Sequence, residues 1–240
     1  MEFTYEGYIS FLSLLRKNGY EIYGDYNDDE CESGKKICVL RHDVDFSLDK
    51  AEEMAAIEKD NGISSVYFFM LTGNYYNSFS KRGCEIINNI RQFGHSIGLH
   101  FDETVYYGES DLTREEYIEL IKREASMLEY TIGSEVKMVS MHEPSQRFLK
   151  MNLAIPGMIN VYSDIFFQKY KYLSDSRMKW KENIEDVVKS NLYSRIQLLT
   201  HPFWYHKNEL SRKDILKEFV SKGSSYRMSA LMEYYPEING

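Results

Sequence analysis

Short apolar runs alternate along the chain with segments of helical periodicity, and this alternation constrains the fold more than any other feature of the sequence. Seven runs are strand candidates: KICVL (36–40), SVYFFML (65–71), SIGLH (96–100), KMVSMH (137–142), residues 159–162, residues 170–173 and RIQLLTH (195–201). Runs that are apolar almost throughout are typical of strands buried on both faces, as in a parallel sheet covered by helices. About seven such strands predict an α/β fold, an irregular (β/α) barrel of parallel strands in which residues 1–240 form a single domain.

Capping residues mark helices between these strands. Ser47 can cap a helix that Gly62 ends, and Thr113 forms a capping box with Glu116 for a helix that ends near Gly133. Each of these helices joins two predicted strands, so it can serve as the crossover that a pair of parallel strands requires.

Composition excludes several classes of protein. The formal net charge of -8 at pH 7 gives no positive field for nucleic acid or an anionic membrane, and no apolar run approaches the ~20 residues of a membrane span. The N-terminal segment MEFTYEGYISFLSLL has acidic residues and periodic apolar ones, which predicts a helix rather than a secretory signal. Cys31, Cys38 and Cys84 form no CxxC pair or disulfide framework. We therefore expect a cytoplasmic protein with reduced thiols.

Ionisable residues follow five of the apolar runs. They are His42, Asp43 and Asp45, then His100 and Asp102, then His142, Asp175 and His201. A single His or Asp after a strand is often a turn former or a helix cap, but a barrel brings all these strand ends onto one rim. Asp and His are the ligands of a catalytic zinc or similar divalent site, so the rim is predicted to bind such an ion. His95 lies five residues before His100 and would point to the opposite face of a strand, so we expect a structural role for it.

The motifs at these positions resemble those of a known family. RHDVD, GHSIGLH, HEPS, SDSRMKW and LLTHP, between Val39 and Pro202, are similar in order to the motifs of the polysaccharide deacetylase (NodB-homology, carbohydrate esterase) family. GHSIGLH is the most specific of them. The sequence most resembles a divergent branch of that family associated with bacterial surface-polysaccharide gene clusters.

The resemblance implies both an activity and residue roles. The expected activity is metal-dependent hydrolysis that removes an N- or O-acetyl group from a sugar or polysaccharide precursor. Asp43 is expected to be the general base, Asp45 and His100 to be metal ligands, and His201 to be the general acid. A divalent metal, zinc in the first instance, is the expected cofactor, and a carbohydrate is the expected partner.

Three positions depart from the family pattern. Val44 separates two aspartates that are adjacent in the family, Thr104 stands where a second ligand histidine is usual, and His142 stands where an arginine is usual. A catalytic zinc generally has three protein ligands, so we predict that His142 supplies the third. The alternative is that His142 orients Asp43, as the family's arginine would.

Aromatic residues near the predicted rim are candidates for stacking on a sugar ring. Trp180 and Trp204 each lie just beyond a rim motif, and with Asp175 they are the predicted substrate-binding residues. Two other functions remain open. One is a carbohydrate-binding protein that kept the fold and lost catalysis, and the other is a metal hydrolase of a non-sugar amide or a phosphate ester.

Overall fold

The computed structural model describes residues 1–24, 34–106 and 111–239. Cys31 lies outside these residues, and Cys38 and Cys84 are free thiols. The elements of the first half are α1 (Tyr5–Lys17), β1 (Tyr20–Tyr23), β2 (Lys36–Val44), α3 (Leu48–Asp60), β3 (Val66–Phe69), α4 (Lys81–Gln92), β4 (Ser96–Phe101) and the 3-10 turn η1 (Glu103–Tyr106). Those of the second half are α5 (Arg114–Ile132), β5 (Met138–Met141), α6 (Gln146–Met151), β6 (Ile159–Asn160), α7 (Asp164–Lys169), β7 (Lys171–Ser174), η2 (Ser176–Met178), α8 (Ile184–Lys189), β8 (Arg195–Thr200), η3 (Pro202–Trp204), α9 (Arg212–Tyr234) and η4 (Pro236–Asn239).

The strands form one curled parallel sheet in the order β6-β5-β4-β3-β2-β8-β7. Every strand pair in it is parallel, and β1 adds a further strand beside the first half of β2. Within the described residues the sheet ends at β6 on one side and at β7 on the other, so the barrel is open there. This half-barrel of seven parallel strands surrounded by helices confirms the predicted (β/α) fold.

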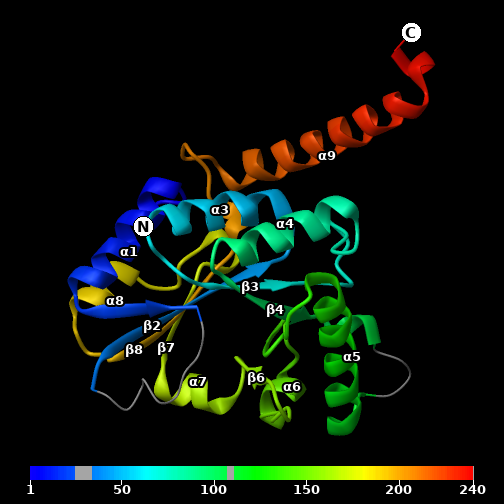
Figure 1. The fold of residues 1–240 in the computed structure, drawn as a ribbon. Helices are drawn as coiled ribbons and strands as arrows, with labels where there is room; N and C mark the ends of the chain where they lie inside the picture. Colours follow the sequence, from blue (N-terminus) through cyan, green and yellow to red (C-terminus); the bar gives the residue numbers. More distant parts are fainter. Residues whose placement is uncertain (25–33, 107–110, 240) are drawn as a thin grey trace.

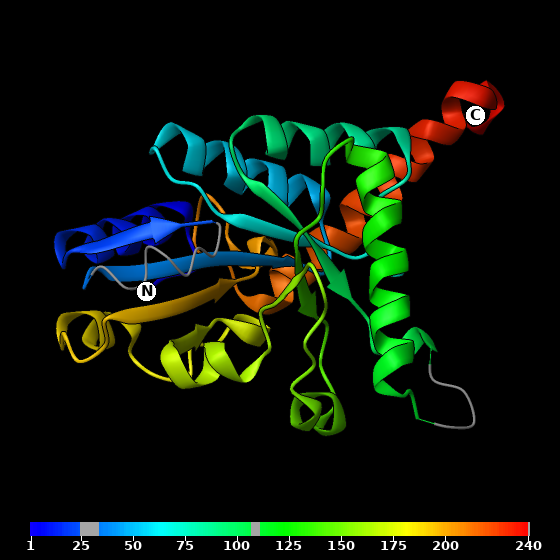
Figure 2. The same ribbon diagram turned by 60° about the horizontal axis from the view of Figure 1, so that its bottom comes forward.

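Helices cover the outside of the sheet, and side chains fill its interior. Figures 1 and 2 show α3, α4 and α5 along the outer face, with α1 and α8 beside the other end of the sheet. The predicted caps are present: the Ser47 side chain accepts the Lys50 amide, and Thr113 and Glu116 form the capping box. The inner cluster includes Val39 from β2 and Phe68 from β3. Both faces of the strands thus carry buried hydrophobic side chains, as the apolar runs predict.

Strand β2 is longer than its apolar run. Beyond the run Lys36–Leu40 it continues into the RHDVD motif, through Arg41, His42 and Asp43 to Val44. Successive side chains of a strand point to opposite faces, so Arg41 and Asp43 face the interior and His42 faces α3, where its Nε2 lies 2.9 Å from a carboxylate oxygen of Glu58. The longer strand therefore carries polar groups into the barrel.

Helix α9 follows the last strand and extends away from the sheet in both views (Figures 1 and 2). Its first turns pack through Ile215, which is buried. No helix in residues 1–24, 34–106 or 111–239 combines the length and the apolar character needed to cross a membrane.

Candidate metal centre

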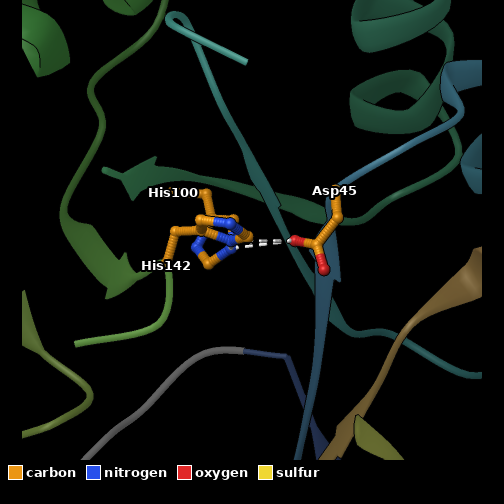
Figure 3. Close-up of side chains that lie close together, drawn as sticks. All are labelled: Asp45, His100 and His142. Carbon is orange, nitrogen blue, oxygen red and sulfur yellow. Dashed lines mark hydrogen bonds and ion pairs between the residues drawn. The ribbon is translucent and has the colours of Figure 1, made fainter. Parts of the chain in front are cut away.

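Three of the predicted site residues converge where neighbouring strands end. Asp45 directly follows β2, His100 lies in β4, and His142 directly follows β5. Nε2 of His100 is 3.0 Å from Oδ1 of Asp45, and Nδ1 of His142 is 3.5 Å from the same oxygen and 3.3 Å from Nε2 of His100. Figure 3 shows both imidazoles turned toward the Asp45 carboxylate. Each of these three residues offers one ligand atom, and the three atoms all lie within 4.8 Å of one another, close enough to hold a metal ion.

The electrostatics of this group favour an ionised carboxylate among imidazoles. Burial alone raises the pKa of Asp45, but the hydrogen bonds from His100 and His142 and the charge of His201 outweigh burial and lower it far below its ordinary value. The same hydrogen bond raises the pKa of His142 against the effect of burial. A divalent cation can replace protons in such an arrangement, because it offers positive charge to the carboxylate and takes a lone pair from each neutral imidazole.

His201 approaches the group from β8 and is held by a buried aspartate. Its Nδ1 lies 2.6 Å from Oδ1 of Asp175, whose other oxygen accepts the Tyr205 hydroxyl at 2.9 Å, and its Nε2 lies 3.7 Å from Oδ2 of Asp45. The Asp175 carboxylate also accepts the backbone amide of His201. Burial lowers the pKa of His201, but the charge and hydrogen bond of Asp175 and the charges of Asp45 and Asp43 raise it, to about 9. This imidazole is therefore oriented and favoured in its protonated form.

Asp43 lies two residues before Asp45, inside β2, and is 2% exposed. Its Oδ2 accepts hydrogen bonds from Nη2 of Arg41 at 3.2 Å and from Oγ of Ser140 at 3.0 Å. Its Oδ1 has no hydrogen-bond partner among the described residues. The carboxylate is thus fixed through one oxygen and leaves the other free to accept a proton.

Sequence reasoning missed Arg41 and Ser140. Arg41 precedes Asp43 by two residues in RHDVD, and period-2 alternation alone puts the two side chains on one face. The signal for Arg41 was therefore present in the sequence. Ser140 carries no such signal, because its contact with Asp43 depends on the curvature that brings β5 and β2 together.

The position of His142 relative to Asp45 and Asp43 bears on the two arrangements considered for it. His142 lies with Asp45 and His100, while the hydrogen bonds of Asp43 within the described chain go to Arg41 and Ser140. Binding of an ion by these side chains remains a prediction.

The residues expected to contact substrate lie differently from the prediction. Trp204 is 6% exposed and packs on Phe203 and Phe46 in the outer core, with ring centroids 4.8 and 6.0 Å away. Trp180 is partly buried and stacks on Phe3. Asp175 is fully buried and serves His201 rather than the surface. The physical reason is apolar packing, because both indole rings belong to the hydrophobic cluster that also contains Phe3, Phe46 and Phe203.

Two further expectations concern His95 and Asp102. His95 is buried, with Nε2 3.0 Å from the carbonyl oxygen of Ala55 and Nδ1 3.0 Å from Oγ of Ser65, in the structural role expected of it. Asp102 accepts the amide and hydroxyl of Thr104 and lies outside the group of Asp45. It therefore forms a local turn.

No protein-family model matches the sequence. No curated protein matches it either. Among solved structures, the chain is similar to a family 4 carbohydrate esterase from Bacillus anthracis, with 16% identity, 89% of this chain and 86% of that chain covered, and a TM-score of 0.41. It is similar to a polysaccharide deacetylase from Bacillus cereus, with 16% identity, 79% and 89% covered, and a TM-score of 0.46. A third is a wild-type CE4 family pseudoenzyme from Bacillus anthracis, with 12% identity, 79% and 62% covered, and a TM-score of 0.41.

These solved structures are carbohydrate esterases or deacetylases of the kind that the sequence motifs resemble, and a pseudoenzyme of that family stands among them. Identities of 12 to 16% and TM-scores below 0.5 assign no activity to this chain. The case for a function therefore rests on the site residues themselves.

Proposed function

We propose that this protein is a metal-dependent hydrolase that removes an N- or O-acetyl group from a sugar or polysaccharide precursor. The observation that carries the proposal is the meeting of three kinds of group at one end of the half-barrel. Asp45, His100 and His142 form a three-donor group, Asp43 is a buried carboxylate with one free oxygen, and His201 is an imidazole backed by a carboxylate.

The donor set suits a divalent ion such as zinc. Two imidazoles and one carboxylate are the kind of three-residue set that catalytic zinc sites use, with a further position left for water or substrate. When bound there, the ion supplies a Lewis acid that polarises an acetyl carbonyl and lowers the pKa of water. Asp45, His100 and His142 would hold it.

Asp43 and His201 then have complementary roles. Asp43, fixed through Oδ2, can accept through Oδ1 the proton of the attacking water. Asp175 holds Nδ1 of His201, which leaves Nε2 on the side of Asp45 to give a proton to the departing amine or hydroxyl of the sugar. Acetyl hydrolysis requires one group that accepts a proton from the attacking water and another that gives a proton to the leaving group.

The deciding experiment combines metal analysis with an assay of acetate release. The purified protein is analysed for metal before and after treatment with chelator, and acetate is measured with nucleotide-linked N-acetyl sugars as substrates. We expect stoichiometric metal, acetate release that chelator abolishes, and recovery on adding zinc. Asp45→Asn is the matched control, since it removes a donor and keeps the shape of the side chain.

Each of the other possible results indicates a different function. Folded protein that takes up no metal would contradict the proposal and indicate a carbohydrate-binding protein without catalysis. Stoichiometric metal without acetate release from any acetylated sugar would exclude deacetylation, and a hydrolase of a non-sugar amide or phosphate ester would then fit the site.

A further inference from the structure

A buried carboxylate links the chain segments that follow two of the three donor residues. Glu103 lies three residues after His100 and is 1% exposed. Its carboxylate accepts the backbone amide of Ser145 and, at 3.3 Å, the Ser145 hydroxyl. Ser145 lies three residues after His142 and caps α6. Glu103 also accepts the hydroxyl of Tyr117 in α5, which is itself buried. One side chain thus ties the segment after His100, the segment after His142 and the helix behind them.

The segment after His142 needs such a tie, because its backbone is strained. Glu143 has a φ of 40°, in the left-handed region that favours glycine. A residue in that region persists when the surrounding structure fixes it in place. The fixed points on either side are the backbone amide of His142, which donates to the carbonyl of Phe101 at 2.8 Å, and Ser145, which is held by Glu103.

We propose that Glu103 is a positioning residue that holds the imidazole of His142 at the candidate metal centre. Hydrogen bonds to an ionised carboxylate are stronger than those between neutral groups, so Glu103 can keep Glu143 in its left-handed conformation. That conformation bends the chain directly after His142, whose ring lies beside Asp45 and His100. Thr104, the residue after Glu103, stands where the family that the sequence resembles has a second ligand histidine. In this protein the turn that contains Thr104 instead positions His142, which follows β5.

This inference rests on the proposed function, since it assumes that Asp45, His100 and His142 bind an ion. Its test therefore uses metal affinity rather than activity. The dissociation constant for Co²⁺ is measured by competition with a chromophoric chelator, and the visible absorption of bound Co²⁺ reports the ligand geometry. Circular dichroism and thermal unfolding of each apo protein show that the variants compared are folded.

The variant is Glu103→Gln, which keeps size and burial and removes the charge. We expect Co²⁺ affinity to fall about 10-fold, the lower end of the range typical of residues that support a ligand, with an altered absorption spectrum. The matched control is Glu124→Gln. Glu124 is a buried carboxylate that also accepts a tyrosine hydroxyl, from Tyr106 in the 3-10 turn η1 that contains Glu103. The Co²⁺ affinity of Glu124→Gln should stay within about twofold of the wild-type value.

A double-mutant cycle shows whether Glu103 acts through His142. In a His142→Ala background, Glu103→Gln should cause no further loss of Co²⁺ affinity. Wild-type affinity in Glu103→Gln, an equal loss in Glu124→Gln, or an additive loss in the double variant would each overturn the inference. Failure of the wild-type protein itself to bind Co²⁺ would instead overturn the proposed function.

If Glu103→Gln does not fold, a variant with a shorter carboxylate side chain at this position provides a second test. Glu103→Asp keeps the charge, but it is one methylene short of reaching both Ser145 and Tyr117. We expect a Co²⁺ affinity between those of wild type and His142→Ala, and an affinity equal to that of wild type would count against the positioning role.

Discussion

Substitution of Glu58 tests whether the buried polar network behind β2 stabilises this fold. Glu58, in α3, is fully buried and accepts two donors at each carboxylate oxygen. One oxygen accepts the hydroxyls of Tyr67 and Ser65, both at 2.7 Å, and the other accepts Nε2 of His42 at 2.9 Å and the Tyr8 hydroxyl. Glu58→Gln keeps the volume but places an amide NH₂ opposite two of these donors, whichever way the amide turns.

Two routes give the same magnitude. Leaving two of these buried donors without an acceptor costs about 1–3 kcal/mol for each. Independently, burial raises the pKa of Glu58, but the charge and hydrogen bond of His42, the charge of His95 and the Tyr8 hydroxyl outweigh it and lower the pKa from 4.5 to about 2. At ~1.4 kcal/mol per unit of pKa, this difference corresponds to about 3 kcal/mol of stability at neutral pH. We expect Glu58→Gln to lower the free energy of unfolding by about 3 kcal/mol at pH 7.

The pH dependence has a definite sign. The pKa of Glu58 is lower in the folded state than in the unfolded state, so its contribution is fully present above pH 4.5 and is lost as the pH falls toward about 2. The wild-type protein therefore loses stability across this window, and Glu58→Gln has no charge there to lose. The difference between the two proteins should shrink progressively between pH 4.5 and pH 2.

Urea unfolding followed by far-ultraviolet circular dichroism at pH 7, 4 and 3 provides the measurement. Glu85→Gln in α4 is the matched control, because Glu85 is exposed and its substitution should change the free energy of unfolding by less than about 0.5 kcal/mol. A loss below about 1 kcal/mol for Glu58→Gln at pH 7, or a difference that stays constant with pH, would refute the reasoning.

The remaining predictions concern the candidate site. Asp43→Asn should abolish acetate release and leave metal content nearly unchanged, and loss of metal would make Asp43 a ligand. Asp45→Asn and His100→Ala should lose metal and activity together, and full occupancy in either would exclude the proposed centre. His142→Ala should likewise hold less than stoichiometric metal by elemental analysis, because only two donors remain. His201→Ala should slow turnover by about 10²–10⁴-fold with metal content intact, and an unchanged rate on an unactivated acetamide would remove it from the mechanism.

Much of the architecture was predictable because it depends on local patterns. The apolar runs identified seven strands of the sheet, and the capping signals at Ser47 and Thr113 identified the first turns of α3 and α5. Strand β1, with the sequence YEIY, was missed because it is not an apolar run and only its first residue is buried. Its place in the sheet comes from its pairing with β2. The short helices α6 and α7 were missed as well.

The candidate site divides in the same way. That ionisable residues follow successive strands is a property of the sequence, and parallel strands carry those residues to one edge of the sheet. Which of them approach one another is not, because it depends on how far each strand runs and how the sheet curls. Arg41 faces Asp43 because β2 continues to Val44, and Ser140 meets Asp43 through the curvature of the sheet.

By itself, the sequence determined the parallel α/β fold, the edge at which polar groups gather and the kinds of group found there. Apolar periodicity and side-chain chemistry are local properties, so they can be recognised without knowledge of long-range packing. Only the tertiary structure decided the grouping of His142 with Asp45 and His100, the pairing of Asp175 with His201, and the burial of Trp204. These outcomes depend on the path of the chain after each strand, which long-range packing sets, as the link from Glu103 to Ser145 illustrates.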